Sequence, residues 1–147
     1  MSGIVCAVRG GPNSRPTIDR AVHLAQETGL VLHFLYVVNL DFLTHTTSTR
    51  VRTISQEMHQ MGEFILLSAQ SRAESEGVTA QTEIRQGNVG QEIVDLCRDL
   101  DADYVVMGRP QIEQEESLFT QERLQAFIQD AEEQTGAKVV LPEGGSE

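Results

Sequence analysis

Short apolar runs alternate with helical segments along almost the whole chain of 147 residues. The runs are rich in Val, Ile, Leu and Ala and have the length of buried strands. The segments between them carry apolar residues at helical spacing and residues typical of helix caps. This alternation predicts a doubly wound α/β domain, with a parallel sheet and helices on both faces. The predicted strands lie in 3–11, 30–38, 78–85, 103–108 and 137–142, and the predicted helices lie in 13–29, 49–76, 86–102 and 120–134.

The third predicted strand differs from the others because polar and apolar residues alternate along it. Such alternation is typical of a half-exposed strand, so we expect this strand at an edge of the sheet. The long helix before it repeats apolar residues at helical spacing, which predicts one buried face. The residues that share one side of the strand are Val78, Ala80, Thr82 and Ile84, and those that share one face of the helix are Ile54, Met58, Met61, Ile65 and Ala69.

The charge balance excludes several kinds of partner. Acidic residues number 22 and basic residues 11, which gives a formal net charge of -11. Such a chain repels nucleic acid and anionic lipid, so neither is an expected partner. No apolar stretch approaches the ~20 residues of a membrane span, and the first residues lack a signal-peptide pattern. We therefore expect a cytoplasmic protein with one domain over 1–142 and a disordered tail over 143–147.

Residues with catalytic or metal-binding chemistry are scattered. Cys6 and Cys97 lie far apart in apolar runs, which favours two buried, reduced thiols. No pair of histidines has a metal-ligand spacing, and no serine lies in a Gly-x-Ser-x-Gly elbow. The acidic segment that contains Asp99, Asp101 and Asp103 is expected to be a solvated turn. The sequence therefore predicts no catalytic residue and no metal site.

Four stretches, in order, resemble the universal stress protein family. They are IVCAVRGGPNSRPTIDRAVHLA, LHFLYVVN, RQGNVGQEIVDLCRDLDADYVVMGR and AKVVLP. Because they stand at the separations usual in that family, the resemblance extends over 4–142. It implies a five-stranded sheet of order 3-2-1-4-5 and a cytoplasmic role in stress or growth arrest. It also implies a homodimer, often made by pairing of the fifth strands, here Val139, Val140 and Leu141.

The family has one branch that binds ATP and one that does not. The ATP-binding branch carries Gly-x2-Gly-x9-Gly-(Ser/Thr) after the fourth strand and an Asp at the end of the first. In this chain only Gly108 matches that motif, and Arg9 stands at the Asp position. Ligands of such sheets lie beyond the carboxyl ends of the strands. If a nucleotide binds, the expected crevice positions are Ala7, Arg9, Val37, Met107, Gly108, Arg109, Gln111, Gln121 and Glu122.

The substitutions in this motif oppose phosphate binding. Gln111 and Gln121 replace glycines whose backbone freedom lets N–H groups turn toward phosphate. Glu122 replaces a hydroxyl donor with an anion that only accepts hydrogen bonds. We therefore expect no cofactor and a non-catalytic protein that acts through dimerisation and partner binding. The alternative is a nucleotide-binding switch with a degenerate phosphate loop, because Arg9 and Arg109 are able to hold an anion.

The same loop carries several carboxylates of its own. Glu122 is expected in the first turn of the last helix, where the helix dipole favours an anion. We therefore expect Arg9 or Arg109 to pair with Glu122 or with one of the acidic residues of 113–116.

Overall fold

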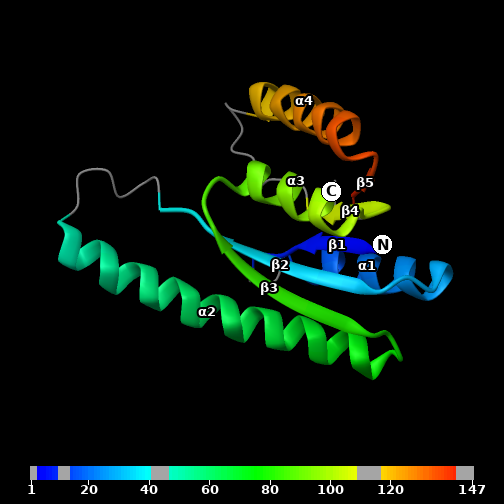
Figure 1. The fold of residues 1–147 in the computed structure, drawn as a ribbon, viewed down its shortest axis with the longest axis horizontal. Helices are drawn as coiled ribbons and strands as arrows, with labels where there is room; N and C mark the ends of the chain where they lie inside the picture. Colours follow the sequence, from blue (N-terminus) through cyan, green and yellow to red (C-terminus); the bar gives the residue numbers. More distant parts are fainter. Residues whose placement is uncertain (1–2, 10–13, 41–46, 109–116, 142–147) are drawn as a thin grey trace.

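The computed structural model describes residues 3–9, 14–40, 47–108 and 117–141, and within 117–124 it describes the backbone alone. In this part of the chain strands and helices alternate strictly (Figure 1). No helix of the described residues is long and apolar enough to cross a membrane. The strands are β1 (Ile4–Ala7), β2 (Leu32–Val38), β3 (Ala80–Gln86), β4 (Tyr104–Met107) and β5 (Lys138–Val140), and the helices are α1 (Ser14–Thr28), α2 (Ser48–Ser75), α3 (Val89–Leu100) and α4 (Ser117–Thr135).

The strands form one parallel sheet of order β3-β2-β1-β4-β5. This order confirms the predicted doubly wound fold, and β3 lies at an edge as its alternating polarity predicts. The central strand β1 pairs with a neighbour on each side, so that Cys6 lies between Phe34 of β2 and Val106 of β4. Helices cover both faces, and Figure 1 shows α3 and α4 above the sheet and α2 below it.

Successive residues of each strand point to opposite faces and divide the core into two layers. Ile4 and Cys6 pack with α1 and α2 in one layer. Val5 packs with α3 in the other layer, which also contains Cys97. Both cysteines are free and buried, as the sequence predicts. A strand that is covered on both faces needs apolar residues at every position, which explains the unbroken apolar run of β1.

The buried face of α2 agrees with the predicted face except at Met61. Ala69 is buried as expected, but Met61 is 56% exposed, so the prediction that Met61 points inward is wrong. Gly62 and Leu66 face the sheet instead. A Cβ on Gly62 would lie 2.4 Å from the ring of Tyr36 in β2. The helix approaches the sheet through a glycine, and a glycine contributes nothing to an apolar pattern.

The third strand is only partly covered. Val78, just before it, and Ala80 are buried, and Ile84 packs against the same layer. Thr82, on the same side of the strand, is exposed, as the predicted half-exposed strand allows. At an edge strand, solvent reaches the covered face from the open side.

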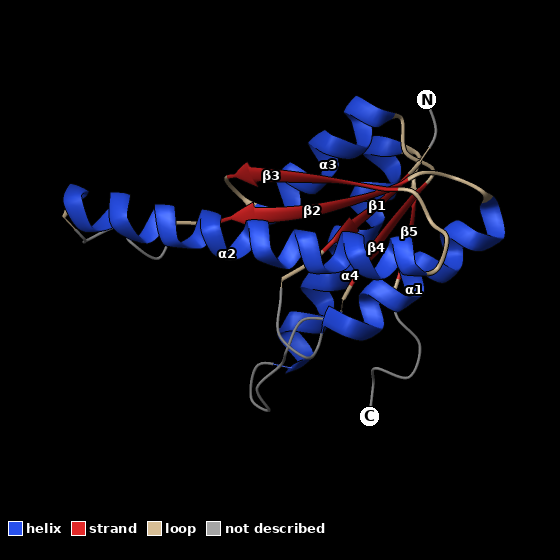
Figure 2. Ribbon diagram, turned by 90° about the horizontal axis from the view of Figure 1, so that it is seen from below, coloured by secondary structure: helices blue, strands red, loops and turns tan. Residues whose placement is uncertain are grey.

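Helix α2 extends beyond the sheet. Its buried residues lie only between Gly62 and Ala73, in its second half. Figure 2 shows the first half projecting past the carboxyl ends of β2 and β3. The expected tail 143–147 and the loop 109–116 lie outside the described residues.

Candidate functional site

A cleft of about 430 Å³ opens at the carboxyl ends of the central strands. It lies where the strand order reverses between β1 and β4, which is the usual ligand position in a doubly wound sheet. Strand ends supply most of its wall, and α2 and the start of α3 supply the rest. Its described lining is Ala7, Val8, Arg9, Leu35, Tyr36, Val37, Asn39, Met58, Val89, Ile93, Met107 and Gly108.

Most of this lining is apolar. Leu35 and Ile93 are buried beneath it, and Val89 is 37% exposed at its rim. Tyr36 is held against Gly62 of α2, and burial raises the pKa of its hydroxyl above the ordinary value. The phenol therefore stays protonated at neutral pH. Such a wall suits a flat apolar group better than a chain of phosphates.

Arg9 is the one cation in the described lining of the cleft. Its side chain is exposed at the end of β1, and no described carboxylate forms an ion pair with it. An arginine at this place can bind an anion but cannot accept a hydrogen bond from a ribose hydroxyl. The expected partners of Arg9 in 113–116, the side chain of Glu122, and the loop residue Arg109 lie outside what the structure describes.

Gly108 has a packing partner behind it. A Cβ at this position would lie 2.8 Å from the Oγ1 atom of Thr17, which is too close for any real side chain. Thr17 belongs to α1 and is 2% exposed. The backbone of β4 therefore approaches α1 so closely at this point that only glycine fits. This requirement exists whether or not a phosphate lies in front of Gly108.

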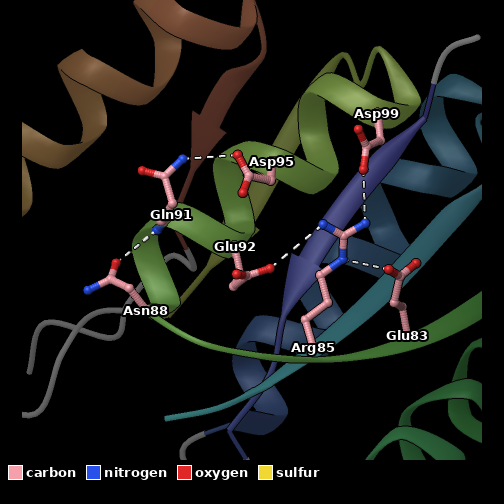
Figure 3. Close-up of polar contacts among 7 residues, drawn as sticks. All are labelled: Glu83, Arg85, Asn88, Gln91, Glu92, Asp95 and Asp99. Carbon is pink, nitrogen blue, oxygen red and sulfur yellow. Dashed lines mark hydrogen bonds and ion pairs between the residues drawn. The ribbon is translucent and has the colours of Figure 1, made fainter. Parts of the chain in front are cut away.

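The start of α3 forms the rim of the cleft. The Asn88 side chain caps the helix, because its Oδ1 atom accepts a hydrogen bond of 2.9 Å from the backbone N–H of Gln91 (Figure 3). Gly87 before it has a positive φ of 149°, and a Cβ there would lie 2.7 Å from the carboxylate of Glu92. This turn therefore starts α3 at a position that places Val89 in the wall of the cleft.

The structure brings together five of the predicted crevice residues. Ala7, Arg9, Val37, Met107 and Gly108 all line the cleft. The remaining predicted positions are not placed there, because 109 and 111 lie outside the described residues and 121 and 122 are described by backbone alone, within α4.

Sequence reasoning missed seven residues of the described lining, three of which belong to helices. Tyr36 belongs to a strand that was correctly predicted, and its bulk next to Val37 is the signal that points to it. The helical residues carry no such signal, because the angle at which a helix crosses the sheet is not visible in a sequence. The seven missed residues are Val8, Leu35, Tyr36, Asn39, Met58, Val89 and Ile93.

A cluster of ion pairs joins β3 to α3 on the face of the sheet that α3 covers (Figure 3). The guanidinium of Arg85 binds Glu83, lies 3.0 Å from Asp99 and lies 3.7 Å from Glu92. Burial lowers the pKa of Arg85, but hydrogen bonds to Glu83 and Asp99 outweigh it and leave this pKa above the ordinary value. Asp99 is exposed to solvent as predicted, but it lies in the last turn of α3 and is paired with Arg85. The cluster holds the edge strand against the helix, which is a structural role.

The described residues contain no group of three or more His, Cys, Asp or Glu side chains that would suit a metal ion. The thiols are also poor nucleophiles, because burial raises the pKa of Cys97 to about 12 and raises that of Cys6 as well. Asp101 ends α3 with a left-handed backbone, as a turn residue does.

Comparisons with known proteins agree with this fold. A model of the universal stress protein family matches residues 1–131. The universal stress protein YxiE of Bacillus subtilis is 27% identical over 113 residues, which cover 71% of this chain and 76% of that protein. The structure of universal stress protein UspA from Lactobacillus plantarum has a TM-score of 0.77 at 16% identity, with 97% of each chain covered. A universal stress protein solved in complex with cAMP has a TM-score of 0.68 at 18% identity, with 95% of each chain covered.

Proposed function

Because the chain belongs to the universal stress protein family, whose members are generally non-enzymatic stress proteins, we propose that it is a cytoplasmic stress-response protein that acts by binding other protein chains, without catalysis and without ATP. The contact between Gly108 and Thr17 carries this proposal. This contact gives Gly108, the only glycine that matches the ATP motif, a packing role. Gly108 therefore no longer counts as evidence for a phosphate site.

The chemistry of the cleft supports the same conclusion. Its described lining offers one cation, Arg9, and a wall that is mainly apolar. A triphosphate brings several negative charges, and the chain around the site carries a net charge of -11. Binding would therefore depend on a strong local excess of N–H donors or cations. The described residues of the cleft do not provide such an excess.

The proposal includes a homodimer formed through β5. This strand lies at an edge of the sheet and pairs only with β4 among the described strands. Val139 and Val140 are half-buried, as is Leu141 just beyond the strand. An apolar edge strand that is left uncovered favours pairing with a second chain. Pairing here would continue one sheet across two molecules.

A second candidate function is a nucleotide-responsive switch that binds a monophosphate. The cleft lies at the position expected for a ligand, and one protein of similar fold is solved with cAMP. The apolar wall around Val37 suits a nucleobase, and Arg9 alone is able to balance a single phosphate charge. This candidate requires no phosphate loop, so the altered glycine motif does not oppose it.

Thermal unfolding with and without ligand separates the two candidates. Ligand at one hundred times its dissociation constant adds about 2.7 kcal/mol to the free energy of unfolding. We expect no shift with millimolar Mg-ATP, and a clear shift would contradict the first proposal. A shift with AMP or cAMP that is lost in Arg9→Gln and kept in Arg15→Gln would support the second. Arg15 is a matched control because it is an exposed arginine that does not line the cleft.

A further inference from the structure

The outer face of α2 carries three large apolar side chains that are mostly in solvent. Met61, Phe64 and Leu67 are 56%, 70% and 62% exposed, and we call these three residues the α2 patch. Their spacing of three residues places them on one side of the helix. Gly62 and Leu66, which face the sheet, lie on the opposite side. Three adjacent side chains of this kind form a contiguous patch rather than single exposed residues.

A groove lies beside the α2 patch, between α1 and α2. It has a volume of about 690 Å³, and Phe64 and Leu67 form part of its wall. Ile18 of α1 and Ile65 of α2 add apolar surface to it. The rest of the groove is lined by Arg15, Arg72 and four serines, whose side chains are small. These serines are Ser14, Ser68, Ser71 and Ser75.

We propose that the α2 patch binds the α2 patch of a second copy of this chain, with the two α2 helices antiparallel and related by a two-fold axis near Phe64. A two-fold interface uses the same surface on both partners, so a projecting residue and the hollow that receives it must be adjacent. This chain has that arrangement, since the exposed ring of Phe64 lies next to the groove. Each Phe64 enters the groove of the other copy.

The charges along α2 permit this arrangement. Around an axis at Phe64, residues at equal distances before and after it face one another across the interface. Met61 then meets Leu67, and Glu57 meets Ser71 of the other copy. No like charges come together among these outer-face positions, although each chain carries a net charge of -11. Charges of both signs lie around the α2 patch, because Arg15 and Arg72 line the groove and Glu57 precedes the patch, and such a mixed surface lets two acidic chains associate.

Other occupants fit the surface less well. Helices that lie on a membrane carry an excess of Lys and Arg beside their apolar face, whereas Glu57 and Glu63 flank the α2 patch along the helix and balance Arg15 and Arg72 of the groove. The interface is separate from the cleft and from β5, so it depends neither on a ligand nor on the proposed pairing of edge strands.

Sedimentation velocity of Phe64→Glu tests the proposal, because the new carboxylate becomes buried only if a second copy covers the α2 patch. Val31→Glu is the matched control, because Val31 is also an exposed apolar residue but lies outside the patch. We expect Phe64→Glu to lose one association step, with an unchanged circular dichroism spectrum, and Val31→Glu to sediment as the native protein does. A native protein that remains monomeric at high micromolar concentration would overturn the proposal. So would a Phe64→Glu variant that associates as fully as the native chain, which would leave association to β5.

A second variant tests the arrangement of the helices. Helix axes packed about 8–10 Å apart bring facing Cα atoms within the reach of a disulfide. Oxidation with copper phenanthroline should therefore link Phe64→Cys into a covalent dimer, and Val31→Cys should stay monomeric on a non-reducing gel. The native cysteines do not compete, because both are buried. If Phe64→Cys forms no more dimer than Val31→Cys, the antiparallel pairing is wrong and the patch serves a different partner.

Discussion

The carboxylate of Glu132 accepts a hydrogen bond of 2.9 Å from the backbone N–H of Val139. Lys138 donates its own N–H toward β4, to the carbonyl of Asp103. Alternate residues of a strand point their backbone groups to opposite sides, so the N–H of Val139 points to the open edge of the sheet. Glu132 thus caps the outward donor at which a second β5 strand would pair. Pairing through β5 must break this bond first.

Glu132→Ala should therefore strengthen association through β5 while weakening the isolated fold. The freed N–H of Val139 becomes available to a second chain. The lost hydrogen bond to a charged acceptor should reduce the free energy of unfolding by about 1–3 kcal/mol. Sedimentation equilibrium and urea unfolding measure the two effects. Glu133→Ala, a neighbouring exposed residue, is the control. Equal dissociation constants for Glu132→Ala and the native protein would show that the bond does not guard this edge.

Gly62→Ala should destabilise the protein although alanine favours helices. The exchange gains up to about 1 kcal/mol of helix propensity. The new Cβ would lie 2.4 Å from Tyr36, and overpacking of this kind costs typically about 1–3 kcal/mol. In a Tyr36→Leu background the ring is absent, so the same exchange should become neutral or stabilising. Urea unfolding of the four proteins provides the cycle. A loss of equal size in both backgrounds would place the strain elsewhere.

Arg85→Met should lower stability by about 1 kcal/mol or more, since it leaves three carboxylates without their shared cation. The remaining charges repel one another, and salt screens that repulsion. The difference between Arg85→Met and the native protein should therefore shrink between 0.05 and 1 M NaCl, a range over which the screening length falls from more than ~10 Å to ~3 Å. Arg98→Met is the control, because Arg98 is exposed and makes no ion pair with another described residue. A difference that is independent of salt would mean that packing of the arginine stem dominates.

His33 should make the fold less stable in mild acid. Burial lowers its pKa in the folded protein, and nearby Glu83 only partly offsets this effect. Below the ordinary pKa of about 6.5, the unfolded chain takes up the proton more readily than the folded one. The stability that the neutral ring contributes is thus complete above pH ~6.5 and declines as the pH falls. His33→Gln should show a shallower decline of the free energy of unfolding than the native protein in urea unfolding between pH 7.5 and 5. Parallel curves for His33→Gln and the native protein would count against this prediction.

Both thiols should resist modification in the native state. The thiolate is the reactive form, and burial raises the pKa of Cys97 to about 12. Ellman's reagent at pH 8 should find almost no reactive thiol in the folded protein and two per chain in urea. Cys97→Ser and Cys6→Ser then assign each thiol. Rapid modification of one thiol without urea would contradict this prediction and would reveal a local opening of the fold around that thiol.

Sequence patterns predicted the parts of the fold that depend on one element at a time. The apolar run around Val5 marked a strand covered on both faces, and the alternation around Ala80 marked an edge strand. The order of the strands required the family resemblance, because periodicity carries no information about neighbours. The strand ends Ala7 and Val37 were correctly expected at the cleft, since parallel strands end on the same side of a sheet.

Features that depend on two elements at once were not predictable in this way. Gly62 faces Tyr36 from another element, and the apolar pattern of α2 therefore put Met61 on the buried face and missed Gly62. Arg85 meets Asp99 because β3 and α3 run side by side, although fourteen positions separate the two residues. Met58 reaches the cleft only because of the angle at which α2 crosses the sheet. Each of these contacts is set by distances between elements, which composition and spacing do not encode.

The contact between Thr17 and Gly108 limits what a shared motif glycine can mean. A side chain at position 108 would clash with Thr17 unless residue 17 were smaller, so the two positions are coupled through space. A motif score that counts Gly108 as one quarter of a nucleotide signature therefore counts a helix-packing requirement as a binding signal. In members with a large residue at the position of Thr17, this glycine should be discounted. The motif glycines that still indicate nucleotide binding are those against which no helix packs.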